Sequence, residues 1–283
     1  MTRFSFEIFP PKSDAARATL GTCLADLRPL DADFISVTYG AGGSTRSASP
    51  ETARLAKQAT GAPVIGHLTC VGQSREEVLD AAGAYREAGV RRILALRGDP
   101  AKDSKGFAPH PDGFADSCAL VAALADRGFD VTVAAYPDPH PDAADPGAAL
   151  DWLKRKQDAG ASAAITQFAF TPGRYLRLRD AAVAAGVTIP IIAGILPVKD
   201  WTSAHRFARK CGAEIPLELE QAFDTADRHD RARLFALTQA TELATDLIAG
   251  GMDRLHFYTL NSADLVSDIC AALAGPGALS NAA

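Results

Sequence analysis

Short apolar and β-branched segments recur along the chain, and longer segments with helical periodicity lie between them. The intervening segments, such as 75–88, 114–127 and 172–186, carry apolar residues at three- and four-residue spacing and end near glycine. We interpret them as amphipathic crossover helices. The apolar segments predict strands at about 4–9, 33–39, 63–70, 91–98, 130–137, 163–170, 189–197 and 254–261.

Eight strand–helix units in 283 residues predict an α/β fold, a single (βα)8 TIM barrel, because such barrels usually take about 250 residues. The alternative is an open doubly wound sheet. It is disfavoured because no G-x-G-x-x-G follows the first strand, and the glycines of 39–46 follow the second strand at a different spacing. Within 212–253 we expect a long helix at about 225–249, beside one that starts near Asp200. We assign 1–275 to the barrel and 276–283 to a C-terminal tail.

Composition and charge narrow the class of partner. Apolar residues make up 47% of the chain, enough for a sizeable core, and the net charge of -5 comes from interspersed charges without a basic stripe. We therefore expect a small-molecule partner and no nucleic acid. The N-terminus lacks a signal-peptide pattern, no window is apolar enough for a membrane span, and the five cysteines are scattered. These features predict a cytoplasmic protein with reduced cysteines and no membrane partner.

In a barrel of this class the chemistry gathers at the C-terminal ends of the strands. Polar residues interrupt or follow the last positions of most of the predicted strands, and we expect them to line one pocket. They are Glu7, Thr38, Tyr39, His67, Arg97, Gly98, Asp99, Tyr136, His140, Gln167, Tyr258, Thr259 and Asn261.

Glu7 is the most unusual of these residues because it interrupts an apolar strand. Flanked by Phe4, Phe6, Ile8 and Phe9, its carboxyl group should lose water, which raises its pKa and suits a proton donor near neutral pH. The alternative is an interior salt bridge with an arginine or lysine of the barrel.

Other candidates have two interpretations each. The Arg97–Asp99 segment offers a cation, a close backbone approach and an anion to a polar heterocycle, or else forms an ordinary loop with one ion pair. His67 is a core histidine or a ligand contact. Arg155 and Lys156 belong to a solvated helix face or neutralise a diphosphate. Phe207 is a core residue or stacks on a planar ligand.

A metal site is not expected. Asp138, His140 and Asp142 alternate in YPDPHPD, but the prolines there favour a rigid surface loop, and the chain has no H-x-H or H-E-x-x-H motif.

Several segments together resemble the methylenetetrahydrofolate reductase family. The resemblance implies an eight-stranded barrel that binds FAD non-covalently and reduces 5,10-methylenetetrahydrofolate to 5-methyltetrahydrofolate with NADH or NADPH, by ping-pong hydride transfer. The segments are SFEIFPPK (5–12), ISVTYGAGG (35–43), HLTC (67–70), ALRGDP (95–100), AAYPDPHPD (134–142), LKRKQDAGASAAITQFAF (153–170), GILPV (194–198) and HFYTLN (256–261).

The resemblance also implies a role for each matching residue. Glu7 would be the general acid that protonates the folate bridge nitrogen, and Asp99 would stabilise the resulting cation and tune the flavin. Glu7, Thr38 and Gln167 would contact the folate, Gln167 would also contact the nicotinamide, and Phe207 would stack on whichever is bound. The implied FAD contacts are Thr38, Tyr39, Ala41, His67, Arg97, Gly98, Asp99, Ala115, Tyr136, His140, Ala143, Arg155 and Lys156.

The sequence departs from the family pattern at four positions. Ala149 and Trp152 replace an Asp and an Asn common near the FAD adenosine, Ser203 replaces a Gln that contacts folate, and Ser262 replaces an Arg that binds substrate. The choice between NADH and NADPH stays open, and family members commonly self-associate, which leaves a homo-oligomer as an option. Two rival functions remain: a flavin-free folate- or pterin-binding barrel for methyl transfer or aldol chemistry, and an inactive ligand-binding barrel.

Overall fold

Eight parallel strands close into a barrel in chain order, β1 to β8, with β1 paired to β8. The computed structural model describes residues 2–39, 48–99, 108–138 and 146–274, so the predicted tail 276–283 lies outside the described residues. The closed barrel confirms the predicted fold. The strands are β1 (Arg3–Ile8), β2 (Ile35–Val37), β3 (Val64–Thr69), β4 (Arg92–Leu96), β5 (Asp130–Ala135), β6 (Ala161–Thr166), β7 (Ile191–Ile195) and β8 (Arg254–Tyr258).

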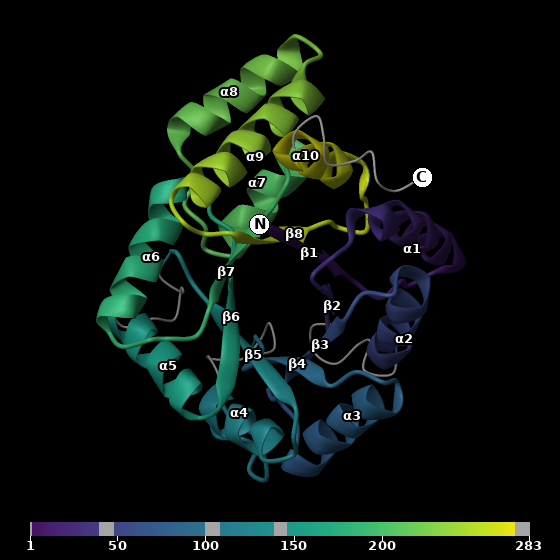
Figure 1. Cartoon of the computed structure of the whole chain (residues 1–283), viewed down its shortest axis with the longest axis vertical. Helices are drawn as coiled ribbons and strands as arrows, with labels where there is room; N and C mark the ends of the chain where they lie inside the picture. The colour runs from purple at the N-terminus through teal and green to yellow at the C-terminus, as the bar shows by residue number, and fades with distance from the viewer. Residues whose placement is uncertain (1, 40–47, 100–107, 139–145, 275–283) are drawn as a thin grey trace.

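Helices surround the barrel (Figure 1). Their starts follow local chemistry: α3, for example, begins with a capping box in which Ser74 and Glu77 each bond the other's backbone N–H. The described helices are α1 (Asp14–Leu27), α2 (Ala48–Thr60), α3 (Arg75–Glu87), α4 (Ser117–Ala125), α5 (Pro146–Asp158), α6 (Pro172–Ala184), α7 (Trp201–Lys210), α8 (Leu217–Arg228), α9 (Ala232–Ala249) and α10 (Asp264–Ala274), with one 3-10 turn, η1 (Arg28–Leu30).

The prediction of one long helix at about 225–249 is wrong in one respect, because two helices, α8 and α9, occupy this part of the chain. The break falls at Asp230, whose φ of 55° lies in the left-handed region that ends a helix. α8 buries one residue, Phe223, which stacks on Trp201 at 4.4 Å between ring centroids and contacts Phe235 at 4.7 Å. Leu219 of α8 also packs against the core, so the apolar positions of this helix are present in the sequence, and the error lies in the missed turn at Asp230.

Successive side chains of each strand point to one of two cores, one against the helices and one inside the barrel. Residues that point outward pack against the helices, whereas a separate cluster fills the barrel interior: Phe34, Ile65, Leu94, Ala163, Ile165 and Ile192. Buried polar side chains of the interior form hydrogen bonds with one another: His256 bonds Ser5 at 2.9 Å through Nδ1 and Ser36 at 3.2 Å through Nε2. The interior is therefore a packed plug.

No helix in the described part of the chain is long and apolar enough to cross a membrane.

Candidate active site

Glu7 lies inside the barrel near the C-terminal end of β1. It pairs in register with Ser36 of β2 and Tyr258 of β8, and its side chain is 19% exposed. Burial raises the pKa of the carboxyl group to about 8, so Glu7 holds a proton at neutral pH. The prediction of a raised pKa is confirmed.

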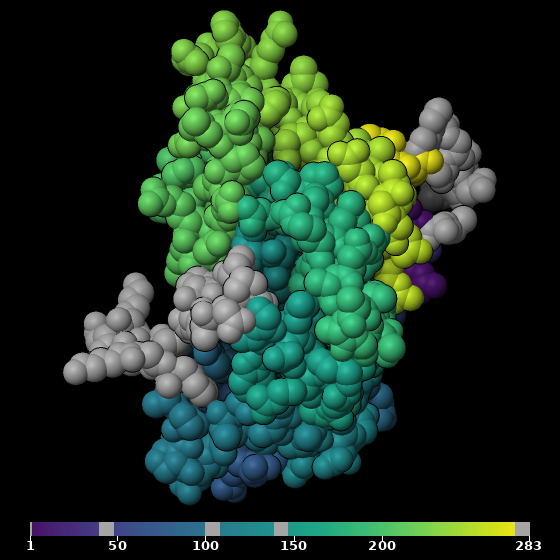
Figure 2. Space-filling model, turned by 90° about the vertical axis from the view of Figure 1, so that its left-hand side faces the viewer, coloured from purple at the N-terminus to yellow at the C-terminus, as the bar shows by residue number. Residues whose placement is uncertain are grey.

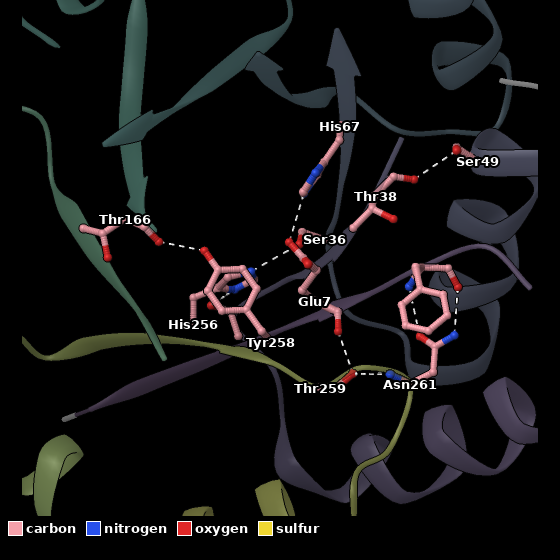
Figure 3. A network of polar contacts seen from close by, with 12 residues as sticks. Glu7, Ser36, Thr38, Ser49, His67, Thr166, His256, Tyr258, Thr259 and Asn261 are labelled. Atoms are coloured by element: carbon pink, nitrogen blue, oxygen red, sulfur yellow. Dashed lines mark hydrogen bonds and ion pairs between the residues drawn. The ribbon is translucent and has the colours of Figure 1, made fainter. Parts of the chain in front are cut away.

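His67, on β3, faces Glu7 across the interior (Figure 3). Its Nε2 lies 3.6 Å from Glu7 Oε2 and has no hydrogen-bond partner among the described residues. Burial lowers the pKa of His67 to about 3, so the imidazole is neutral. The group at ion-pair distance from Glu7 in the described part is thus a neutral histidine, rather than the arginine or lysine of the alternative interpretation.

Tyr258 closes the side of the site between β6 and β8. Its hydroxyl donates to the Thr166 carbonyl at 2.7 Å, and this reach depends on Gly194 of β7. A Cβ at Gly194 would lie 2.2 Å from the Thr166 carbonyl oxygen and 2.7 Å from the Tyr258 hydroxyl oxygen. Glycine is therefore required there by space alone.

An aromatic row extends outward from Tyr258. Phe168 meets Tyr258 edge-on at 6.0 Å, and Phe207 of α7 stacks on Phe168 at 5.5 Å. Phe207 is 41% exposed, so one part of its ring is covered and another is open. Beside the row, Gln167 is held by its side-chain oxygen, which accepts from the Phe168 N–H at 3.0 Å. Gln167 and Phe207, both candidates from the sequence, thus each contact Phe168 on one side of the mouth.

The end of β4 contributes Arg97, Gly98 and Asp99. Gly98 has a φ of 86°, and a Cβ there would lie 2.5 Å from Val71 Cγ1, so the backbone approaches its neighbour closely. Asp99 is exposed. Burial raises the pKa of the Cys211 thiol to about 11, and the charges of Asp99 and Glu7 add to that rise, which puts both carboxyl groups near the same thiol.

The basic run on α5 divides between three environments. Lys154 pairs with Asp158, and Arg155 lies over the Trp152 ring at 4.2 Å. Lys156 is instead half-buried against the barrel and donates to the Ala134 carbonyl at 3.1 Å, and loss of water around it lowers its pKa to about 8. Of the three cations of the run, Lys156 is the one that turns inward.

α5 meets the start of α4 at this edge of the mouth. Arg155 lies 3.9 Å from Asp116, whose side chain caps α4, and the exposed Ala115 precedes that cap. Arg97 and Arg155 both lie close enough to buried groups here to influence their pKa values: Arg97 that of Lys156, and Arg155 that of Cys118. Ala115, Arg97, Arg155 and Lys156 therefore lie at one edge of the mouth, and their contact with FAD stays a prediction.

The other predicted residues have different outcomes. Thr38 is half-buried, and Tyr136 lies near enough to Tyr258 to raise the pKa of its hydroxyl. The Tyr39 ring packs in the helix-facing core, so its side chain does not line the interior plug. Ala41, His140 and Ala143 lie outside the described residues. The described residues contain no group of three or more His, Cys, Asp or Glu side chains that could hold a metal ion.

Two of the four positions that depart from the family pattern, Ser203 and Ser262, form hydrogen bonds with nearby residues. The backbone N–H of Ser203 donates to Asp200 at 2.7 Å, which caps α7. The Ser262 hydroxyl contacts Lys199 at 3.0 Å and donates to Asp264 at 2.8 Å. A lysine from the loop after β7 thus stands beside Ser262.

Two features of the site were not assigned from the sequence. The sequence placed Tyr258 at a strand end but gave it no role. Its contact with Thr166 of β6 depends on Gly194 of β7, and a local pattern does not show that these three strands meet there. Asn261 clamps β1 to the segment after β8, accepting from the Phe9 N–H and donating to the Phe9 carbonyl, both at 2.9 Å. The Leu260 and Asn261 φ values of 50° and 58° mark a tight turn, which an Asn predicts only weakly.

The profile of the family described as Methylenetetrahydrofolate reductase matches residues 1–274. The chain belongs to this family. The resemblance noted in the sequence is therefore confirmed, and the chain is an enzyme of an oxidoreductase family.

Family relatives match over nearly the whole chain. The 5,10-methylenetetrahydrofolate reductase of Escherichia coli is 40% identical over 269 residues, which are 94% of this chain and 88% of the relative. The Salmonella typhimurium relative of the same name matches equally well. Methylenetetrahydrofolate reductase (NADH) 1 of Zea mays is 34% identical over 92% of this chain, which spans 46% of that longer protein.

A solved structure shares the fold. A protein from Clostridium thermocellum that binds two copies of 5-methyl-5,6,7,8-tetrahydrofolic acid aligns with a TM-score of 0.63 and 15% identity, covering 95% of this chain and 92% of the other. At this identity the likeness concerns the fold alone.

Proposed function

We propose that this reductase converts 5,10-methylenetetrahydrofolate to 5-methyltetrahydrofolate, with FAD as bound cofactor and NADH or NADPH as reductant. Membership of the family supports the folate substrate. The observation that carries the proposal is Glu7, a carboxyl group that keeps its proton at neutral pH at the mouth of the barrel.

The residues present fit an anionic flavin cofactor. Lys156 is a half-buried cation bonded to a backbone carbonyl, and no carboxylate of the described residues lies at ion-pair distance from it. Such a group favours an anionic ligand, here the diphosphate, with Arg155 and Arg97 near it. Gly98 lets the end of β4 approach Val71 closely, which fixes the backbone between Arg97 and Asp99. Bound FAD would supply two-electron chemistry, taking hydride from the nicotinamide and giving it to the folate.

The chain's own residues would handle the proton and the charge. Glu7 would donate its proton to the folate bridge nitrogen, which opens the five-membered ring to a cationic iminium. Asp99, an exposed carboxylate at the same mouth, would stabilise that cation. A protonated acid and a second carboxyl group at the same mouth suit the opening of an aminal.

Gln167 and Phe207 support use of one binding face by two ligands in turn. Both contact Phe168, Gln167 at its backbone N–H and Phe207 at its ring, and the Phe207 ring is partly open. A planar nicotinamide or pterin can stack on such a ring. Alternate occupation of one face corresponds to a ping-pong sequence.

The test is the absorbance spectrum of the purified protein. We expect a yellow protein whose flavin band is bleached by NADH or NADPH without oxygen and restored by methylenetetrahydrofolate. A colourless protein that cannot be reconstituted with FAD would favour the flavin-free barrel. A flavin band that the nicotinamide bleaches but methylenetetrahydrofolate does not restore would overturn the proposed folate substrate, while the proposed FAD cofactor would stand.

A further inference from the structure

We propose that His67 is a positioning residue for Glu7, whose imidazole N–H donates a hydrogen bond to the Glu7 carboxylate once the proton has left it. The inference rests on the proposed function, in which Glu7 is the acid. It assigns to His67 a role toward the acid itself, in addition to any contact with the cofactor.

The geometry of the pair carries the proposal. His67 Nε2 is buried, lacks a hydrogen-bond partner among the described residues and lies 3.6 Å from Glu7 Oε2 (Figure 3). A shift of a few tenths of an ångström makes this contact a hydrogen bond, and contacts of catalytic groups are often long before substrate binds. The strand that carries His67 is held from behind, since Tyr85 donates to the His67 carbonyl at 2.9 Å.

Other polar groups around Glu7 have partners of their own. On β2, Ser36 is bonded to His256, and on β8 the Tyr258 hydroxyl donates to Thr166. Thr259 donates to the backbone carbonyl of Glu7 at 2.6 Å. Beyond α7, burial raises the pKa of the Cys211 thiol while the neighbouring Lys210 lowers it, so Cys211 is a neutral and weak donor, and the Asp99 carboxyl group after β4 adds a negative charge. His67 is the donor that faces the carboxyl oxygen.

The charge state of His67 defines what it does. Because burial lowers its pKa to about 3, the ring carries one N–H proton at neutral pH and does not become a cation beside Glu7. His67 therefore transfers no proton. In the step proposed, the Glu7 proton moves to the folate nitrogen, the electron pair stays on the carboxylate, and the Nε2–H of His67 donates to Oε2. That bond stabilises the ionised form and makes Glu7 a stronger acid.

The first test measures Glu7 without catalysis. The infrared carbonyl band of the protonated carboxyl group, identified by its loss in Glu7→Gln, is titrated in the purified protein with its cofactor. His67→Met removes the N–H donor, whereas His67→Gln keeps one at a comparable distance along the side chain. We expect the Glu7 midpoint to rise by about one to two pH units in His67→Met and to stay near the wild-type value in His67→Gln.

A matched control separates this contact from a general effect of burial. His256 is a second buried histidine, and both of its ring nitrogens have serine partners. His256→Met should leave the Glu7 midpoint where it is. Equal shifts in the two methionine variants, or no shift in His67→Met, would overturn the proposal.

The second test follows the two half-reactions by stopped flow. In His67→Met the folate half-reaction should slow about tenfold, and its decline at alkaline pH should move to higher pH, while flavin reduction keeps its pH profile. An infrared shift without any change in the folate half-reaction would uphold the contact between His67 and Glu7 but overturn the role of Glu7 as the acid.

Discussion

Glu7 keeps its proton at neutral pH because its side chain points into the barrel. Successive residues of β1 alternate, so Phe6 and Ile8 pack outward in the main core while Ser5 and Glu7 point inward. The sequence predicted a raised pKa from the apolar neighbours of Glu7. The direction was right, but the carboxyl group loses water because it is enclosed by the other strands, and those lie far away in sequence.

The same limit explains what could be predicted for His67. A histidine that interrupts an apolar strand is visible in the sequence, and so is its place at a strand end. Its distance of 3.6 Å from Glu7 follows from the closure of the barrel, which no local pattern encodes.

Replacing Glu7 by Gln should separate the two half-reactions. The variant keeps the shape of the side chain but has no acidic proton, so folate reduction should fall by about 10²–10⁴-fold while flavin reduction by the nicotinamide stays nearly intact. Stopped-flow absorbance checks both steps. Glu51→Gln, on the exposed face of α2, is the control and should change neither. Equal damage to the two half-reactions would make Glu7 a structural residue.

At the scale of the element, the helical rotation of about 100° per residue separates neighbouring cations on α5. The run LKRK suggested one basic face in sequence, yet Lys154 pairs with Asp158 and Lys156 turns into the barrel. The sequence identified the run, whereas the choice of inward residue depends on how α5 packs on β5 and β6. The sequence also missed α8, because its separation from α9 depends on the left-handed turn at Asp230.

Flavin retention should depend on Lys156 more than on its neighbours. Lys156→Ala removes a half-buried cation, so we expect release of FAD on dilution and gel filtration, measured by the absorbance of the protein peak. Arg155→Ala should have a smaller effect because its side chain is 59% exposed. Lys154→Ala is the matched control. A Lys156→Ala protein that stays as yellow as the control contradicts the assignment of Lys156 to the diphosphate.

Replacing Gly194 by Ala should destabilise the barrel. The new methyl group would collide with the Thr166 carbonyl and the Tyr258 hydroxyl, and overpacking of this kind costs about 1–3 kcal/mol in free energy of unfolding. Urea denaturation measures the loss. Gly21→Ala in α1, where nothing lies within 4 Å of the new Cβ, should instead stabilise by about 0.5–1 kcal/mol. Equal effects in the two variants would show that the space at Gly194 is not tight.

At the scale of the whole molecule, the buried groups of the interior make the free energy of unfolding depend on pH. Glu7 has a pKa of about 8 when folded and 4.5 ordinarily, so the folded state holds an extra proton between these values and Glu7 lowers stability as pH rises across them. His67 and His256, at about 3 against 6.5, act in the opposite sense between about 3 and 6.5.

The sum of these groups predicts a maximum in stability near pH 6.5. Below it the two histidines outweigh Glu7, and between about 6.5 and 8 Glu7 acts alone and stability falls. Lys156, at about 8 against 10.5, adds a rise only above that range. Urea denaturation from pH 5 to about 8 tests this. Glu7→Gln should abolish the fall above the maximum, and a fall that persists in that variant would have another origin.

The turn between α8 and α9 has a practical consequence for engineering. α8 lies outside α9 at the top of both Figure 1 and Figure 2, and His229, Asp230 and Arg231 join the two helices there. All three side chains are exposed, and no strand of the barrel passes through this turn. Exposed turns of this kind accept foreign segments well. A fluorescent reporter or an immobilisation tag can therefore be inserted within the chain at 229–231, where it leaves the pairing of β7 with β8 intact.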